Sequence, residues 1–341
     1  MKVFVTGVAG FLGSWIAESL LKAGHSVVGV DNFVGGEENN IPLACKVYRP
    51  SADIRDLVLM TKMCEGCDAV YHCAALAYEG LSVFSPSMVA DNVVGGSVAV
   101  ATAAVRCGMK RFVNCSSMAR YGLPYCEDGK SAPFHECDEP EPIDPYGHSK
   151  LAAERILNVV GEQHGMKVLH AVPHNIYGPR QKYDDPYRNV AAIFANLMLQ
   201  GKQPRVYGDG QQVRCFSYVA DVVPVMLRLL DCDAEHGELF NVGPDEGEVT
   251  VKELWARLAD ITGFKLPMLH LPARPREVKH AVCSAQKIRE RFGWSMWTSL
   301  DDGLRSLVAY IERRGVRQFK YHLPIEIDGP DVPRTWKERL Y

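Results

Sequence analysis

The sequence predicts an α/β fold built on a doubly wound parallel sheet. Two observations lead to this prediction. Short runs rich in β-branched residues alternate with longer segments of helical periodicity through the first half of the chain, and a glycine-rich turn directly follows the first run. Such alternation is typical of crossover units, in which each helix leads to the next parallel strand and covers one face of the sheet.

The predicted elements follow one another in strict alternation. We expect strands at residues 2–6, 26–30, 69–72, 111–115 and 167–172, with a further strand just before Asp53. We expect helices at residues 13–23, 57–64, 88–107 and 144–165. After about residue 175 the pattern loosens, with Gly, Pro, Tyr and Asp at residues 177–187 and a helix at residues 190–200. The last twenty residues, which contain three prolines, are expected to form a tail and not a domain.

Composition excludes several classes of protein. The 341 residues are 47% hydrophobic and 23% charged, with a formal net charge of −3, so the basic excess of a nucleic-acid binder is missing. We see no leader and no apolar run of about 18 residues, so we expect no membrane partner. The eleven cysteines show no repeated spacing, and Cys64 and Cys67 form an isolated pair. We therefore expect a cytoplasmic protein with reduced thiols and without a metal site.

Three glycines, Gly7, Gly10 and Gly13, lie between the first predicted strand and the first helix. Glycines there allow a tight turn and a close approach of the backbone to a pyrophosphate, which the helix N-terminus then faces. Asp31 ends the second strand, at about the 20-residue distance where a carboxylate binds the ribose hydroxyls. A carboxylate at that place repels a 2′-phosphate, so we expect the cofactor to be NAD and not NADP.

Two further segments fit the same site by their order along the chain. Asp53 and Ile54 follow the expected third strand, and this segment suits the adenine amino group. Residues 72–75 end the fourth strand with small side chains, so Ala74 and Ala75 allow the backbone to pass under a cofactor. Each segment alone is equally compatible with ordinary packing.

Tyr146 and Lys150 are four residues apart in a predicted helix and therefore lie on one face. The ammonium group of Lys150 would lower the pKa of the Tyr146 phenol and make it usable as a base near neutral pH. Ser117 follows a predicted strand and could share a proton with Tyr146 at the reacting oxygen, although serine is also an ordinary turn residue at strand ends. These three residues are the predicted catalytic set.

Together these motifs resemble the extended short-chain dehydrogenase/reductase family of NAD-dependent nucleotide-sugar epimerases and dehydratases. The resemblance continues through residues 175–180 (Asn-Ile-Tyr-Gly-Pro-Arg), 207–210, 214, 216–221 and 241–243, and it spans about residues 1–315. It implies a Rossmann-type sheet domain at residues 1–174, to which residues 211–243 return. Residues 175–341 would form mainly a smaller, partly interleaved α/β substrate domain and the tail. A nucleotide-diphosphate sugar as substrate and a homodimer are also implied.

The resemblance carries further residues into the NAD site. Phe11 and Leu12, within the glycine turn, would contact the cofactor, as would Asn32 and Asn92. The catalytic tyrosine would bind it too, and Lys150 would bind its ribose as well as tune the tyrosine.

The resemblance likewise implies a substrate site. Asn175 would contact the sugar or its phosphate, and Ser117 and Met118 would lie beside the sugar. Arg214 and Arg274 would clamp the diphosphate, which suits the planar geometry of guanidinium groups.

Two positions separate the activities of the family members that the chain resembles. The 4,6-dehydratases carry an Asp-Glu pair after the motif hydroxyl, where this chain has Met118 and Ala119. At the second place the decarboxylases tend to carry Glu and the 3,5-epimerases Cys. A C4 epimerase needs none of these groups, because it removes the 4-hydroxyl proton, passes the C4 hydride to NAD and takes it back. We therefore expect a C4 epimerase; a 4,6-dehydratase, a 4-keto-reductase and, from another class, a non-catalytic NAD-binding regulator stay open.

Overall fold

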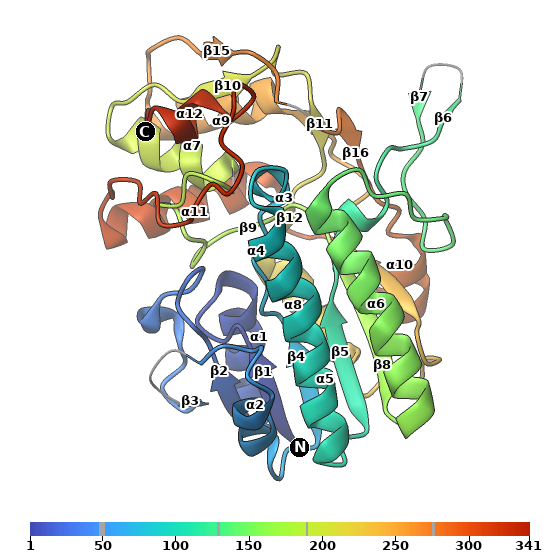
Figure 1. Ribbon diagram of the computed structural model, residues 1–341. Coiled ribbons are helices and arrows are strands. Elements are labelled where there is room, and N and C mark those ends of the chain that lie inside the picture. Colours follow the sequence, from blue (N-terminus) through green and yellow to red (C-terminus); the bar gives the residue numbers. More distant parts are fainter. Residues whose placement is uncertain (48–51, 128–129, 189, 275–276) are drawn as a thin grey trace.

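A seven-stranded parallel sheet forms the centre of the molecule (Figure 1). The computed structural model describes residues 1–47, 52–127, 130–188, 190–274 and 277–341. The strand order is β13-β8-β5-β4-β1-β2-β3, and every neighbouring pair is parallel. The strands are β1 (Lys2–Thr6), β2 (Ser26–Val30), β3 (Lys46–Val47), β4 (Ala69–His72), β5 (Arg111–Cys115), β8 (Lys167–Pro173) and β13 (Leu239–Val242). The predicted doubly wound α/β fold is confirmed.

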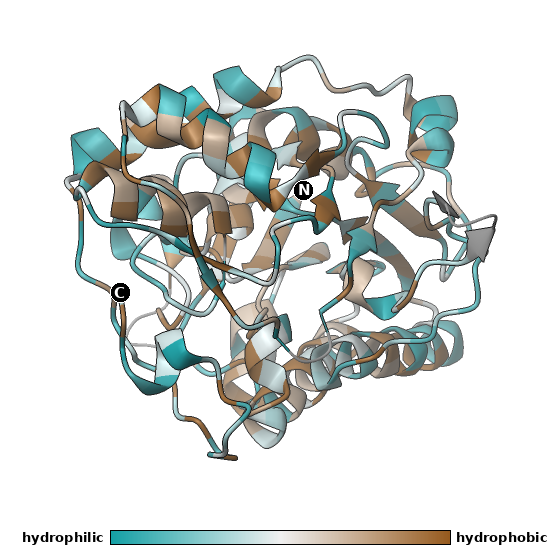
Figure 2. Cartoon of the chain, turned by 90° about the horizontal axis from the view of Figure 1, so that it is seen from above, coloured by the Kyte–Doolittle hydropathy of each residue, from teal (hydrophilic) through white to brown (hydrophobic). Residues whose placement is uncertain are grey.

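Helices cover both faces of this sheet because successive strand residues point to opposite sides. In β1, Val3 and Val5 face one hydrophobic core and Phe4 faces the other, all without exposed surface. The first face carries α1 (Phe11–Lys22), α8 (Val219–Arg228) and α10 (Gln286–Phe292). The second face carries α2 (Leu57–Cys64), α5 (Gly96–Arg106) and α6 (Pro145–His164). Figure 2 shows the brown, hydrophobic parts of the ribbon mainly in the interior.

The helical segment Pro86–Arg106 runs through α4 (Pro86–Ala90), a π-helical turn η2 (Asp91–Gly95) and α5. Its 21 residues are long and apolar enough to cross a membrane by length and composition. Its apolar residues do not form one continuous run, because serines, glycines and an aspartate interrupt them. In the fold, 56% of its most apolar window is buried, and α5 packs against α2 and α6.

Apart from the hydrophobic core on the two faces of the sheet, a second hydrophobic core lies beyond the carboxyl ends of the strands. Three helices enclose it: α7 (Val190–Leu199), α9 (Val251–Thr262) and α11 (Leu300–Arg314). Small sheets accompany them: β10 (Arg205–Tyr207) with β15 (Leu269–Leu271), and β11 (Val213–Arg214) between β14 (Val249–Thr250) and β16 (His280–Ala281). Two further strand pairs are β9 (Ile176–Tyr177) with β12 (Ser217–Tyr218) and β6 (Cys126–Glu127) with β7 (Lys130–Ser131). The remaining elements are the helices α3 (Glu79–Ser82) and α12 (Arg334–Lys337) and the short turns η1 (Glu38–Asn40) and η3 (Met118–Arg120).

The chain passes more than once between the core around the sheet and the second core formed by α7, α9 and α11. After β9, the helix α8 packs on α1, and β13 adds the last strand beside β8. The chain later returns again, because Ala285, Ile288 and Trp294 join the core under α1 and α8. The sequence showed no signal for this second return. The domain boundary at residue 174 stays a prediction.

Candidate active site

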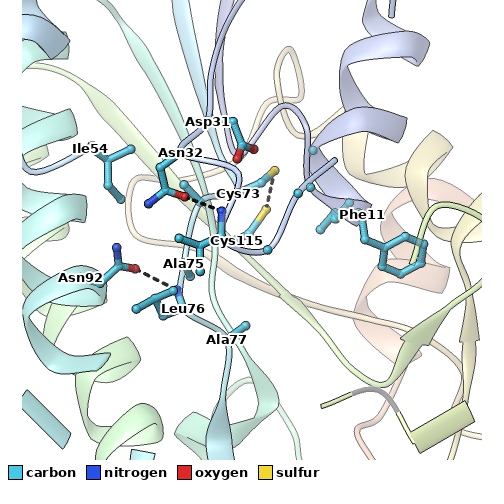
Figure 3. Close-up of a pocket in the computed structure, with 18 of the residues that line it drawn as sticks. Phe11, Asp31, Asn32, Ile54, Cys73, Ala75, Leu76, Ala77, Asn92 and Cys115 are labelled. Carbon is cyan, nitrogen blue, oxygen red and sulfur yellow. Dashed lines mark hydrogen bonds between the residues drawn. The ribbon is translucent and has the colours of Figure 1, made fainter. Parts of the chain in front are cut away.

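A cavity of about 250 Å³ opens at the carboxyl ends of β1, β2, β4 and β5, where ligands bind in open parallel sheets (Figure 3). Nearly all of the predicted cofactor residues line it. They are Gly7, Gly10, Phe11, Leu12, Gly13, Asp31, Asn32, Ile54, Ala74, Ala75, Asn92, Tyr146 and Lys150.

The glycine turn packs as closely as its sequence predicted. Gly7 has a left-handed backbone (φ 72°), and a Cβ there would lie 2.9 Å from the backbone nitrogen of Ala74. A Cβ on Gly13 would overlap the carbonyl oxygen of Gly7. Gly10 is the N-cap of α1, so the first amides of that helix border the cavity. A pyrophosphate fits such a turn, because bare backbone and a helix N-terminus meet there.

Asp31 lies at the end of β2 with its carboxylate 7% exposed. The backbone amides of Ala9 and Phe33 donate hydrogen bonds to its two oxygens, at 2.9 Å and 2.7 Å. Burial raises the pKa of Asp31, while these amides lower it. The carboxylate is therefore held in a fixed orientation on the wall of the cavity, where it suits the ribose hydroxyls of NAD.

Of the predicted cofactor residues that follow Asn32 in the sequence, Ile54 and Asn92 line the cavity and Asp53 does not. Asn92, in the π-helical turn, accepts a hydrogen bond from the Leu76 amide at 2.8 Å (Figure 3). Asp53 does not appear in the cavity wall; its carboxylate accepts the Nε hydrogen of Arg55 at 3.0 Å. A contact between Asp53 and the adenine amino group stays a prediction.

The three predicted catalytic residues come together at one wall of the cavity. Ser117 follows β5 and forms a side-chain hydrogen bond with Tyr146, in the first turn of α6. Lys150 lies one turn further along α6; its Nζ donates to the carbonyl oxygen of Cys115 at 2.8 Å. Asp144 caps this helix by accepting the Gly147 amide at 2.9 Å, and this contact fixes where the helix starts.

The electrostatics of Tyr146 differ from the sequence-based expectation. Burial raises the pKa of Tyr146 above its ordinary value, and the hydrogen bond from Ser117 is the largest influence that lowers it. Lys150 lies 5.8 Å from the centre of the tyrosine ring. Burial also lowers the pKa of Lys150. In the structure, Ser117 is therefore the group that most directly favours the phenolate.

A second cavity, of about 390 Å³, adjoins the first and extends between the two cores. Four of the predicted substrate residues line it: Ser117, Asn175, Arg214 and Arg274. Met118 lies instead in a smaller side pocket that Asn175 and Arg214 also border. Ser117 and Tyr146 line both large cavities.

Backbone and aromatic contacts hold the two arginines. Arg214, on β11, donates to the carbonyl oxygens of Val213 and Val278, each at 2.8 Å. Arg274 donates to Glu277 at 2.7 Å, and its guanidinium carbon lies 4.9 Å from the centre of the Tyr207 ring. Two cations that line one cavity and are fixed in this way form a suitable site for a diphosphate.

Sequence reasoning missed two carboxylates of this cavity. Glu79, on α3, and Asp144 line both the second cavity and its side pocket. Glu79 is an exposed residue, and the protein packed around its carboxylate raises its pKa, with Asp144 adding to the rise and Arg214 opposing it. Glu79 lies only five residues after Ala74, and no motif marks it. Only the fold reveals its role in the cavity, because it brings Glu79 of α3 and Arg214 of β11 to the same cavity wall.

Arg188 lies where the two cavities adjoin. It lines both of them, and its guanidinium carbon lies 4.6 Å from the centre of the Tyr78 ring. Its positive charge lowers the pKa of Tyr146, whereas the charge of Glu79 raises it. Tyr146 is therefore subject to two opposing charges, that of Glu79 and that of Arg188.

Comparison with known proteins gives consistent results. The family model described as "NAD dependent epimerase/dehydratase family" matches residues 3–243. A UDP-glucose 4-epimerase of Mycolicibacterium smegmatis is 32% identical to this chain, and the matched region spans 92% of this chain and 99% of that enzyme. The structure of a UDP-glucose 4-epimerase from Thermotoga maritima with UDP-glucose matches with a TM-score of 0.83 at 32% identity, with coverage of 92% and 99%. A dTDP-glucose 4,6-dehydratase of Streptomyces venezuelae with NAD bound also matches, with a TM-score of 0.83 at 26% identity and coverage of 92% and 97%.

Proposed function

Because the chain belongs to the NAD-dependent epimerase/dehydratase family, we propose that it is a nucleotide-sugar epimerase that inverts C4. NAD is its cofactor, and a nucleotide-diphosphate sugar is its substrate. UDP-glucose is the first candidate, since relatives and solved structures that match the chain carry that name.

One observation carries the proposal: Ser117 and Tyr146 line both the cofactor cavity and the substrate cavity. A group that moves a proton from the sugar must touch the sugar and lie beside the place where the hydride goes. The two arginines that line the second cavity suit the diphosphate, and the sugar would then lie beside Tyr146.

The residues divide the work in the following way. Tyr146 removes the proton of the sugar 4-hydroxyl, and Ser117 donates a hydrogen bond that stabilises the negative oxygen. Bound NAD supplies the hydride acceptor and donor at C4. Lys150 holds the end of β5 through the Cys115 carbonyl and faces the cofactor cavity, in a position suited to the ribose. Rotation of the 4-keto sugar before the hydride returns would invert C4.

Met118 and Ala119 support epimerisation over dehydration, because the Asp-Glu pair is missing. Glu79 is the observation that keeps dehydration as a second candidate, since its carboxylate borders the same side pocket as Met118. Removal of water from the 4-keto sugar needs an acid near C6, and Glu79 is the carboxylate that would supply it.

The test is an incubation of the purified protein with UDP-glucose, followed by proton NMR of the sugar. Formation of UDP-galactose up to an equilibrium mixture, without added reductant, is the expected result. The same assay runs with UDP-N-acetylglucosamine, UDP-glucuronic acid, dTDP-glucose, CDP-glucose and GDP-mannose. Tyr146→Phe is the matched control, because it removes one hydroxyl and keeps the ring. Failure to produce a C4 epimer from any of these sugars would contradict the proposal.

A homodimer and a cytoplasmic location are further proposals that rest on the resemblance and on composition. Light scattering of the purified protein measures the first, and fractionation of the source cells measures the second.

A further inference from the structure

The C-terminal segment, residues 316–341, belongs to no motif of the family, yet it forms part of the substrate cavity. It follows α11 and ends near α7 and α9 (Figure 1). Pro333, Thr335, Trp336 and Tyr341 line the second cavity, while the wall of the cofactor cavity, as far as the structure describes it, contains no residue of this segment. The matched structures cover 92% of this chain although the chain covers 99% of the Thermotoga maritima enzyme, so the chain carries residues without a counterpart there.

Hydrogen bonds attach the segment to the body at separate points. The carboxylate of Glu326 accepts hydrogen bonds from the Ser87 hydroxyl at 2.6 Å and from the Met88 amide at 2.9 Å. Trp336 donates from Nε1 to the Pro186 carbonyl oxygen at 2.9 Å. The segment is therefore fixed both at its middle and near its end, as a permanent wall requires.

Thr335 connects this wall to the arginine that faces the diphosphate. The Thr335 side chain is 1% exposed, and its hydroxyl forms a short hydrogen bond with the Tyr207 hydroxyl. The guanidinium group of Arg274 lies on the ring of the same tyrosine, 4.9 Å from its centre. Arg274 is also held by Glu277, and the part of its position that depends on the aromatic face follows the position of the ring. Thr335 thus fixes the support of Arg274.

Two aromatic residues of the segment complete the wall around that arginine. A Cβ placed on Gly80 would lie 3.5 Å from Cη2 of Trp336 and 3.7 Å from Nη1 of Arg274, so the indole and the guanidinium group both approach this glycine of α3. Tyr341 packs at 5.2 Å on the ring of Phe319 and also faces the cavity. Aromatic walls exclude water, and charges attract each other more strongly where water is excluded.

We propose that residues 316–341 are a substrate-binding wall of this enzyme, in which Thr335 positions Arg274, while Trp336 and Tyr341 shield the nucleoside-diphosphate part of the substrate. This inference rests on the proposed function, since it takes a nucleoside diphosphate as the ligand of the second cavity. The segment should affect substrate affinity and not the chemical step, because none of its residues is among those, such as Ser117 and Tyr146, that line both cavities.

The test measures binding of UDP to the full-length, NAD-loaded protein by titration calorimetry. GDP, CDP and dTDP are titrated in parallel, and the nucleotide that binds the parent protein most tightly is then used for the variants. Thr335→Val removes the hydroxyl at nearly constant volume and should weaken binding about five-fold, which is about 1 kcal/mol at 25 °C. Thr335→Ser keeps the hydroxyl and should restore binding to within two-fold or so of the parent. With the matching sugar, Thr335→Val should raise KM by a similar factor and leave kcat nearly unchanged.

A second pair of variants covers the case in which Thr335→Val does not fold. Tyr341→Ala removes the ring and should weaken UDP binding about ten-fold, whereas Tyr341→Phe should bind like the parent. The NAD content should be the same in all variants. Parent-like UDP binding in both Thr335→Val and Tyr341→Ala would overturn the inference. A protein that binds UDP in this tail-dependent way but epimerises no sugar would contradict the proposed function and leave the wall in place.

Discussion

Lys150 and Tyr146 lie one helical turn apart, with the ammonium nitrogen 5.8 Å from the centre of the tyrosine ring and 2.8 Å from the carbonyl oxygen of Cys115. The lysine thus points past the ring toward the end of β5 and into the cofactor cavity. The hydrogen bond from Ser117 is the largest influence that lowers the pKa of Tyr146. We therefore base the proposed proton transfer on the pair of Ser117 and Tyr146, with Lys150 beside them in the same cavity wall.

Tyr146→Phe should reduce kcat by about two to four orders of magnitude, the range expected when a general base is lost. NAD content and the affinity for UDP should stay close to those of the parent, because one hydroxyl is removed and the ring remains. Steady-state kinetics together with calorimetry check both parts. Ser117→Ala is the comparison variant and should lose less activity. A Tyr146→Phe variant within a few-fold of the parent would remove this tyrosine from the mechanism.

The pH dependence of kcat/KM should report the environment of Tyr146. Burial raises the pKa of this tyrosine, and the base works only when deprotonated, so activity should increase with pH in the alkaline range. Ser117 lowers the pKa of Tyr146, so Ser117→Ala should move the profile to higher pH. Glu79 raises that pKa, so Glu79→Gln should move the profile to lower pH. Shifts in the same direction for the two variants would contradict the assignment.

Incubation in heavy water should leave the C4 hydrogen of the product undeuterated, because that hydrogen travels by way of NAD and not through solvent. No water should be lost from the sugar, since Met118 and Ala119 replace the acid pair of the dehydratases. Proton NMR and mass spectrometry of the recovered nucleotide sugar measure both. Deuterium at C3 or C5, or a product lighter by one water, would show that another acid acts. Glu79→Gln should then abolish that reaction, since Glu79 borders the side pocket.

The protein should purify with NAD bound, because the cofactor is regenerated in each cycle and need not leave. Denaturation followed by chromatography of the supernatant identifies the nucleotide. The carboxylate of Asp31 is held in place by the Ala9 and Phe33 amides and would repel a 2′-phosphate, which has the same sign of charge. Release of NADP in place of NAD would contradict this role of Asp31.

Gly7→Ala should destabilise the protein more than Gly24→Ala. Both glycines have a left-handed backbone (φ 72° and 82°), which costs about 1–2 kcal/mol for alanine. The added methyl meets the Ala74 backbone at 2.9 Å in the first case and nothing within 4 Å in the second. The overlap should add about 1–3 kcal/mol. Thermal unfolding measures the difference, and NAD content should fall only in Gly7→Ala. Equal losses of stability would mean that backbone conformation alone accounts for the effect.

Short-range patterns in the sequence were enough to predict the sheet and the cofactor site. The spacing of Gly7, Gly10 and Gly13 works within a single strand–turn–helix unit, and Tyr146 and Lys150 are joined by one turn of one helix. Asp31 follows from the end of a strand that periodicity alone reveals. The physics of these features is local, because hydrogen bonds within a few residues and one crossover connection fix the geometry.

Only the tertiary structure decided what lies on the sugar side. Glu79 reaches the cavity because α3 packs against α4 and α6, and the tail reaches it because Trp336 packs on Phe84 and Tyr187. These contacts join parts of the chain far apart in sequence, and no periodicity records which of them will form. The sequence alone was therefore enough to identify the cofactor and to predict the catalytic pair, whereas long-range packing decided which further groups line the second cavity, because side-chain burial depends on the whole fold.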